Sequence, residues 1–307
     1  MTTVSIAIAT YNRSKELAIT LRRFSTLVIG NPDKFELLII DNNSSDETKA
    51  VTEEFGREFP GRVRYILEDR QGLSHARNRA VDEAQYDVVA FLDDDVDVEA
   101  DWLINLTAAF ESGDYAAVGG KAYLVYPRAR PRWLGRRDQG YLTEVDLGDH
   151  RKLAKPDELF GVNLSVKKEW IKKVGGFRTD LGRIGACLLS SEETELLERI
   201  ELAGGLILYE PSAAVGHRVP PERLRRSWFW SRSYWGHRGD VRKLPEHAVS
   251  LYELIRATWH IVLAGCALAR TTLVHGLKGE EAFHGIVILA ARLGSWVGRT
   301  ERLAARR

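Results

Sequence analysis

Cysteine is scarce in this sequence. The chain of 307 residues has two, Cys187 and Cys266, with no CxxC motif and no cluster of cysteine and histidine. We therefore expect neither a disulfide framework nor a structural zinc site, because both need several such residues at close spacing. An excess of charge is missing as well, since 44 Lys and Arg stand against 43 Asp and Glu, for a net charge of +1. The chain therefore has no overall positive field that would attract nucleic acid, and we expect no nucleic-acid partner.

A secretory signal is also missing from the first residues. Met1, Thr2 and Thr3 run straight into an apolar strand pattern, without a basic segment followed by a long apolar one. We therefore expect a cytoplasmic protein. Its charge is unevenly distributed, because the first hundred residues are rich in acids whereas Arg128–Arg137 and the last ten residues are basic. This split suggests a metal-holding half followed by a half that meets anions or a membrane surface.

Short apolar segments alternate with amphipathic ones over the first hundred residues. Strands are predicted at Val4–Ala9, Phe35–Ile40, Val63–Leu67 and Asp87–Leu92, with the first, second and fourth buried. Helices are predicted between them, over Lys15–Leu27 with Ser14 as its cap, up to about Phe59, and over Ser74–Gln85. This order predicts an α/β fold with a parallel sheet covered on both faces. Because ligands bind at the carboxyl ends of such strands, Thr10, Asp41 and Asp93 should line one crevice.

The rhythm changes after Asp101. Strands are predicted at Ala117–Val125, Phe160–Val166 and Leu206–Glu210, and helices at Trp102–Phe110, Lys168–Val174 and Glu192–Ala203. The segment Arg128–Asp149 is predicted to be a long loop, and the chain from Pro221 onward to be helical.

Three consecutive acids, Asp93, Asp94 and Asp95, follow the fourth strand. Adjacent carboxylates at the end of a buried strand repel one another unless a cation compensates. Mg²⁺ and Mn²⁺ prefer such oxygen ligands and often share them with substrate phosphates. The alternative is a solvated acidic turn before the next helix, and the nearby strand end at Asp41 favours the metal site.

Four motifs in order carry a family resemblance: Ala9–Arg13 (ATYNR), Ile39–Thr48 (IIDNNSSDET), Gly72–Asn78 (GLSHARN) and Phe91–Asp95 (FLDDD). Together they resemble the family 2 glycosyltransferases of bacterial polysaccharide and glycan assembly. The resemblance covers residues 1 to about 240. It implies the GT-A fold, in which a Rossmann-like mixed sheet binds the nucleotide. It also implies an inverting enzyme that takes a sugar from a UDP, GDP or TDP donor with Mn²⁺ or Mg²⁺.

The resemblance also implies roles for single residues at the donor side. Thr10 and Asn12 would line the nucleotide pocket, and Asp41 would contact the base. Arg77 and Asn78 would lie beside the nucleotide. The remaining assignments concern the acid cluster, where Asp93 and Asp94 would face the donor and the metal ligands would be Asp95, Asp93 and His217. A histidine at a strand end has a structural alternative, which stays open for His217.

The second half of the chain carries further likenesses. Gly161–Ser165 (GVNLS), which contains Asn163, and Gly175–Phe177 (GGF) resemble acceptor-side elements of the family. Ser191–Leu196 (SEETEL) resembles the helix start in which the second acid is the catalytic base, and this makes Glu193 the predicted base. The chain departs from the pattern by having Glu where Asp is usual, so Glu192 remains the alternative. Both acids would also suit a helix N-terminus for electrostatic reasons alone.

The loop Tyr126–Tyr141 contains Trp133 among five arginines. Trp133 can stack on a sugar ring, and the arginines can bind an acceptor linked through pyrophosphate. A basic loop without a ligand is the alternative.

The resemblance suggests a catalytic domain over residues 1–240, with a nucleotide-binding half (1–100) and an acceptor-binding half (101–240). Residues 241–307 would form a helical extension. Its apolar stretches, Ile255–Leu268 and Phe283–Val297, are flanked by arginines and read as too short or too charged to span a bilayer. We expect peripheral contact with the inner face of the plasma membrane, with packing onto the domain or a second subunit as the alternative.

The predicted function is transfer of a sugar to a hydroxyl of a saccharide or lipid-linked acceptor. A nucleotidyltransferase is one alternative, but that class would be expected to carry a glycine-rich phosphate loop after the first strand, where this chain has Thr10–Arg13. A non-catalytic module that binds nucleotide sugars is the other. The sequence does not determine the sugar, the base, the acceptor or the oligomeric state.

Overall fold

The computed structural model describes residues 2–29, 31–185, 187–244, 248–276 and 279–305. The chain divides into two compact units. The first comprises Met1–Val125, Thr143–Thr179 and Glu192–Arg218, and the second comprises Tyr126–Leu142, Asp180–Ser191 and Val219–Arg307. The predicted domain boundary at residue 240 stays a prediction. The compact units have other bounds, because the chain from Val219 and the loop 126–142 pack with the C-terminal helices.

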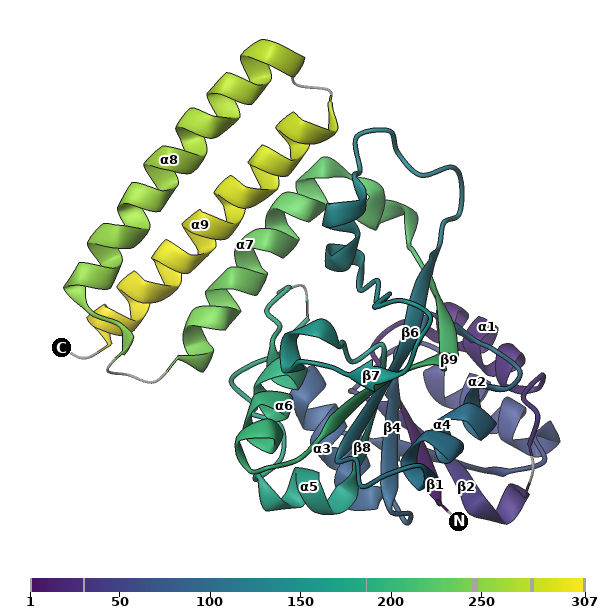
Figure 1. Cartoon of the computed structure of the whole chain (residues 1–307). Helices are drawn as coiled ribbons and strands as arrows, with labels where there is room; N and C mark the ends of the chain where they lie inside the picture. Colours follow the sequence, from purple (N-terminus) through teal and green to yellow (C-terminus); the bar gives the residue numbers. More distant parts are fainter. Residues whose placement is uncertain (1, 30, 186, 245–247, 277–278, 306–307) are drawn as a thin grey trace. The chain divides into compact units, whose positions relative to one another are not determined.

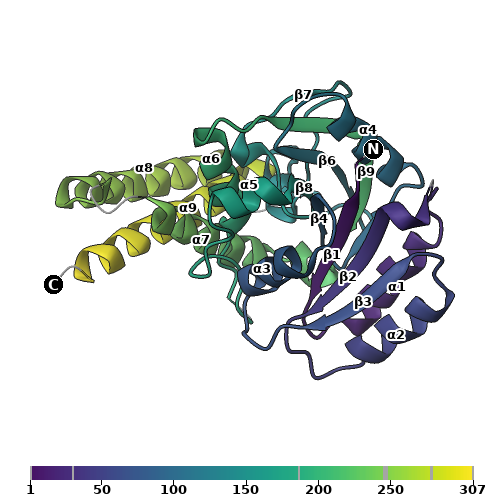
Figure 2. The ribbon, with the colours of Figure 1, turned by 90° about the horizontal axis from the view of Figure 1, so that it is seen from below.

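The first unit begins with a parallel sheet. Its strands lie in the order β3 (Arg62–Leu67), β2 (Phe35–Asp41), β1 (Val4–Thr10) and β4 (Val88–Leu92). The connecting helices are α1 (Ser14–Phe24), α2 (Thr48–Glu58) and α3 (Leu73–Glu83). Figures 1 and 2 show α1 and α2 on one face of the sheet and α3 on the other. The predicted α/β arrangement is confirmed here, and β2 and β4 are buried along their whole length.

The rest of the sheet is mixed. β8 (Asn163–Lys167) lies antiparallel to β4, followed by β6 (Ala117–Val125), β9 (Ile207–Arg218) and β5 (Val96–Val98), while β7 (Lys152–Leu153) pairs with β9. The helices of this half are α4 (Trp102–Glu111), α5 (Lys168–Lys173) and α6 (Glu192–Leu202). β9 runs on past the predicted end at Glu210 because a register shift between Gly120 and Ala122 lets its pairing with β6 resume after Pro211.

The predicted cap of the first helix is wrong. Arg13 occupies the cap position without a side-chain hydrogen bond. The backbone N–H of Ser14 instead donates to Asp46 Oδ2 over 2.8 Å. A residue from the turn after β2 therefore satisfies the first turn of α1, which ties two strand-end turns together.

The second unit is built on three helices, α7 (Arg226–Lys243), α8 (Leu251–His275) and α9 (Glu280–Ala304). A Cβ at Gly294 on α9 would stand 2.0 Å from the carbonyl oxygen of Tyr234 on α7, so only glycine lets these two helices approach this closely. The loop predicted over Arg128–Asp149 contains a short helix, η2 (Arg136–Leu142). Other short helices are η1 (Pro32–Lys34), η3 (Pro156–Glu158) and η4 (Pro221–Leu224).

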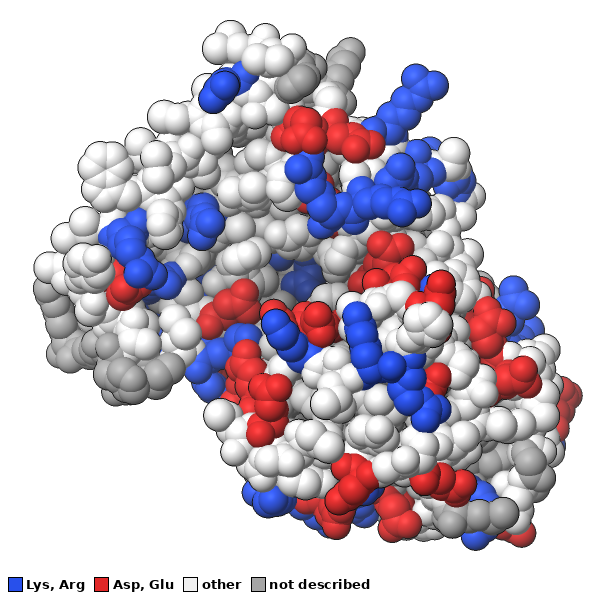
Figure 3. All heavy atoms as spheres, viewed as in Figure 1, with Lys and Arg blue, Asp and Glu red and all other residues white. Residues whose placement is uncertain are grey.

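The apolar stretch predicted as too short for a membrane lies in a longer helix. α8 is continuous through Arg256 and His260, so Leu251–Val274 is long and apolar enough to cross a membrane by length and composition. Little of it is buried within the unit. In Figure 3 the surface over this helix is largely free of charged side chains. α9, in contrast, buries Phe283, Val287 and Ala290, as the packing alternative predicts.

Candidate active site

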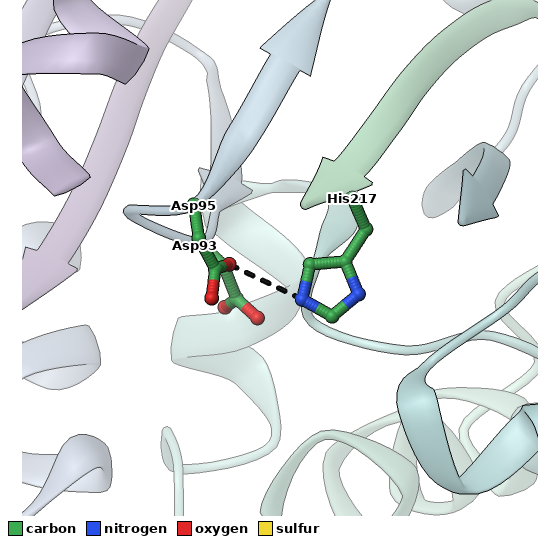
Figure 4. A group of neighbouring side chains, drawn as sticks. All are labelled: Asp93, Asp95 and His217. Atoms are coloured by element: carbon green, nitrogen blue, oxygen red, sulfur yellow. Dashed lines mark ion pairs between the residues drawn. The ribbon is translucent and has the colours of Figure 1, made fainter. Parts of the chain in front are cut away.

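One strand-end turn carries the central acids, and the strand β9 carries the histidine that faces them. Asp93, Asp94 and Asp95 lie between β4 and β5, and the antiparallel register of β5 and β9 sets Val96 opposite His217. One ligand atom from each of Asp93, Asp95 and His217 lies within 4.8 Å of the others. Figure 4 shows the two carboxylates and the imidazole ring facing one another. The acids are close together because they are neighbours in the sequence, and the register of β5 and β9 brings His217 to them.

The ring of His217 is held on both sides. Its Nε2 lies 3.2 Å from Asp95 Oδ1, and its Nδ1 lies 3.0 Å from Thr143 Oγ1. Thr143 has a φ of 64°, which is rare and strained for a β-branched residue. When Nδ1–H donates to Thr143, the lone pair of Nε2 is left toward the acids, which is the tautomer a metal needs. Thr143 lies in the predicted long loop, where no local sequence signal marks it.

Arg13 pairs with the acids next to it. Its guanidinium lies 3.2 Å from Asp94 Oδ1 and 2.8 Å from Asp95 Oδ2. Thr10 Oγ1 donates to Asp94 Oδ2 over 2.7 Å. Burial raises the pKa of Asp94 to about 6, against the lowering effect of Arg13. The motif Ala9–Arg13 contains this arginine, but no sequence pattern indicates that it would reach Asp94 and Asp95.

The cluster fits a divalent metal by the chemistry of its donors. Two carboxylates and a buried imidazole are ligands that Mn²⁺ accepts, and Mg²⁺ accepts the carboxylates. The fourth acid of the run, Asp97, is engaged elsewhere, because it pairs with Arg23 and Arg218. Asp93, Asp95 and His217 are therefore the residues that would hold the ion.

The residues predicted to contact the nucleoside organise the turns after β1 and β2. Asp41 accepts hydrogen bonds from the backbone of Ser44 and from Tyr65 Oη, each over 2.8 Å. Asn12, with a φ of 52°, accepts from the backbone N–H of Ser45 over 2.8 Å. The structure thus places both at the expected edge, and contact with a nucleoside stays a prediction.

Asn78 joins α3 to the segment after α5. Its amide nitrogen donates to the carbonyl of Phe177 and its amide oxygen accepts from the backbone N–H of Phe177, both over 2.8 Å. This pair fixes the segment Gly175–Phe177, where Gly175 and Gly176 have positive φ. A role beside the nucleotide stays a prediction for Asn78.

Arg77 lies with the two candidate bases. Its Nη1 lies 2.8 Å from Glu192 Oε1 and 3.7 Å from Glu193 Oε2. Glu192 is 3% exposed at its side chain and Glu193 is 12% exposed. Burial and the neighbouring Glu193 raise the pKa of Glu192 to about 7, while Arg77 lowers it. Glu193 is thus the more accessible of the two acids.

The residues predicted for the acceptor lie in different surroundings. Asn163 accepts from Trp102 Nε1 over 3.0 Å and donates to the carbonyls of Lys121 and Ala213. In the second unit, Trp133 packs edgewise on Phe229 and Phe283. Arg226 lies over the Trp133 ring, 5.5 Å from its centroid. Contact of either residue with an acceptor stays a prediction.

Comparison with known sequences gives one family. Residues 5–175 match the sequence profile described as Glycosyl transferase family 2. The chain is 29% identical over 263 residues to the succinoglycan biosynthesis protein ExoM of Rhizobium meliloti, which covers 85% of this chain and 80% of that protein. It is 26% identical over 243 residues to the glucosyl-dolichyl phosphate glucuronosyltransferase of Haloferax volcanii, covering 76% of this chain and 74% of that one.

Solved structures resemble the chain in fold. The mannosyltransferase PcManGT from Pyrobaculum calidifontis, in complex with GDP-Man and Mn²⁺, matches with a TM-score of 0.60 and 19% identity, over 99% of this chain and 74% of that one. S. aureus TarS 1–349 in complex with UDP-GlcNAc matches with a TM-score of 0.57 and 14% identity, over 97% and 92%.

Proposed function

Because the chain belongs to glycosyl transferase family 2 and has the GT-A fold, we propose that it is an inverting, metal-dependent hexosyltransferase. The donor is a nucleotide-diphosphate sugar carrying UDP, GDP or TDP. The observation that carries the proposal is the cluster of Asp93, Asp95 and His217 within 4.8 Å at the carboxyl end of the sheet. Two solved structures of similar fold contain Mn²⁺ with a nucleotide or nucleotide sugar, which supports the choice of cofactor.

The acids divide the chemistry between them. A bound Mn²⁺ or Mg²⁺ would supply positive charge to the diphosphate of the donor. Asp93, Asp95 and His217 would hold that ion, while Arg13 and Thr10 hold the neighbouring Asp94 in place. Asp41 and Asn12, at the ends of β2 and β1, line the nucleoside side. These assignments rest on the placement of the side chains at one edge of the sheet.

Glu193 is the proposed base. Its carboxylate takes the proton of an acceptor hydroxyl while that oxygen bonds to the anomeric carbon, and the bond from this carbon to the diphosphate oxygen breaks with its electron pair leaving on the diphosphate. One displacement from the face opposite the leaving group inverts the anomeric configuration. Greater exposure than Glu192 supports Glu193, because a base must reach its substrate.

The acceptor we propose is a saccharide, either free or linked to a lipid, at the inner face of the plasma membrane. One relative is named for succinoglycan biosynthesis and another for transfer to glucosyl-dolichyl phosphate. The exposed apolar face of α8 supports the proposal that the enzyme binds a lipid surface. In this proposal the arginines of the loop 126–142 bind the phosphate groups of such an acceptor.

A binding screen tests the donor and the metal together. Thermal shift is measured with UDP-glucose, UDP-GlcNAc, GDP-mannose and TDP-glucose, each with Mn²⁺ and with EDTA. We expect donors with one kind of nucleotide base to stabilise the protein, and to do so only in the presence of Mn²⁺. Equal stabilisation in EDTA would contradict the metal site. Donor binding without release of the nucleoside diphosphate in the presence of acceptor would leave the non-catalytic module as the function.

A further inference from the structure

Arg77 is a cation enclosed in the first unit. Its side chain is 5% exposed, and its guanidinium forms a 2.8 Å ion pair with Glu192. The same nitrogen, Nη1, lies 3.7 Å from Glu193 Oε2. One guanidinium of α3 therefore serves two adjacent carboxyl groups at the start of α6.

The surroundings fix the guanidinium in this place. A Cβ at Gly161 would stand 2.0 Å from Arg77 Nη2, so the glycine backbone forms a wall against the group. The centroids of the Phe91 and Phe177 rings lie 6.0 and 5.6 Å from Arg77 Cζ. Such packing leaves the cation little freedom to move toward another ligand.

The charge balance at the start of α6 is uneven. Two carboxyl groups and one guanidinium leave one negative charge when both acids are ionised. Burial and the repulsion between the two neighbouring carboxylates favour a proton on the pair, whereas Arg77 disfavours it. Glu192, Glu193 and Asp93 raise the pKa of Arg77 against the lowering effect of burial, so the arginine stays charged.

We infer that Arg77 and Glu192 are positioning residues for the base, which hold Glu193 at the start of α6 in its carboxylate form. This inference rests on the proposed function, in which Glu193 accepts the proton of the acceptor. It gives Arg77 a place in proton transfer and gives Glu192 the task of anchoring the arginine.

Other charged groups on the elements around α6 are engaged or exposed. Glu195 pairs with Arg199 over 2.7 Å and lies 3.9 Å from Arg178. Those of η3 and α5 bond to backbone groups or lie at the surface: Asp157, Glu158, Lys168, Glu169, Lys172 and Lys173. Asp240 of α7 accepts a 2.8 Å hydrogen bond from Ser191 Oγ. Arg77, 3.7 Å away, and the adjacent Glu192 are the charges whose effect on Glu193 the experiment below tests.

The test is the pH dependence of nucleoside diphosphate release from the donor that the binding screen identifies, with Mn²⁺ and with water as acceptor. In Arg77→Met the acidic limb of kcat should move up by about one pH unit or more, because an opposite charge at this distance has been removed. In Glu192→Gln the limb should move down, because the neighbouring carboxyl group no longer competes for Arg77, which is left to Glu193. Arg77→Lys keeps the charge and should return the limb toward that of the wild type.

Affinity for the donor separates this role from direct donor binding. We expect the Kd of the nucleoside diphosphate in Arg77→Met to stay within about threefold of the wild type. If binding is lost while the limb stays in place, Arg77 is a donor ligand and the inference is wrong. If Arg77→Met unfolds, Arg77→Met with Glu192→Gln removes both buried charges, and Glu192→Gln alone still gives the sign of the shift. If Glu193→Gln turns over at the wild-type rate, the proposed base itself fails.

Discussion

The four acids of the run Asp93–Asp97 have different tasks although they are neighbours in the sequence. Asp93 and Asp95 face His217, whereas Asp94 is held by Thr10 and Arg13. Asp97 neutralises two arginines away from this cluster. Composition alone predicts an acidic site here, but the partners that assign each acid come from strands distant in sequence.

The first prediction concerns Asp95. Asp95→Ala should weaken Mn²⁺-dependent binding of the nucleoside diphosphate by at least the 10- to 100-fold that loss of an outer-shell partner of a metal typically costs. Titration calorimetry with and without EDTA measures this. Asp97→Ala is the matched control, and its affinity should stay close to that of the wild type. An equal loss of affinity in the two variants would mean that removing any negative charge has this effect, and that Asp95 is not a metal ligand.

The second prediction concerns stability and Glu192. Its pKa in the folded protein is raised from an ordinary 4.5 to about 7. Burial therefore favours the protonated acid, and the stability it contributes is complete below pH 4.5 and is lost as the pH rises through 7. We expect the wild type to lose on the order of 1–3 kcal/mol relative to Glu192→Gln between pH 5 and pH 8.

Urea unfolding of the two proteins at several pH values gives this difference directly. Glu195→Gln is the control, because Glu195 shares the helix and is paired with Arg199. A gap between wild type and Glu192→Gln that is constant with pH would contradict the raised pKa.

At the scale of elements, the strands of the nucleotide-binding half followed from their apolar, β-branched runs. The bounds of β1, β2 and β3 differ from prediction by a residue at one end. β1 and β2 are apolar because they are buried parallel strands, whereas β3 is partly exposed. β5 and β7 could not be predicted, because three and two residues carry no periodicity and their pairing with β9 creates them. The same tertiary pairing brings His217 to the acids and Thr143 to His217. Arg13 and Arg77 likewise acquire their partners only when α1, α3 and α6 are in place.

The third prediction concerns α8. Trp259 and Leu263 are 63% and 60% exposed, and the helix has no Asp, Glu, Lys or Arg from Ala257 to Ala269. Trp259→Glu with Leu263→Glu should lower the binding of the protein to vesicles of phosphatidylglycerol and phosphatidylcholine by about tenfold or more, because charges would enter the lipid interface.

Vesicle flotation measures the bound fraction of that double variant. Leu202→Glu changes an exposed leucine of the first unit and serves as the control. If the double variant floats as well as the wild type, α8 does not contact lipid. If the wild type does not float and dimerises through Trp259, the exposed face belongs to a second copy of the chain.

At the scale of the whole molecule, the two compact units carry different parts of the proposed function. The first holds the acids, His217, Arg77 and Glu193, and its sheet topology accounts for their meeting. The second holds Trp133, the arginine-rich loop and the apolar helix α8, which suit an amphiphilic acceptor. A net charge of +1 thus conceals an acidic cluster in one unit and basic segments elsewhere.

We propose that this chain transfers a sugar from a nucleotide donor with Glu193 as the base. The decisive experiment compares the rate of nucleoside diphosphate release with Mn²⁺ between the wild type and Glu193→Gln at equal donor occupancy. We predict that the wild type releases the nucleoside diphosphate and that the variant does so at least about 100-fold more slowly, the scale for loss of a general base. The donor Kd should be unchanged. Equal rates in the two proteins, or no release by the wild type with any donor and acceptor, would contradict the account.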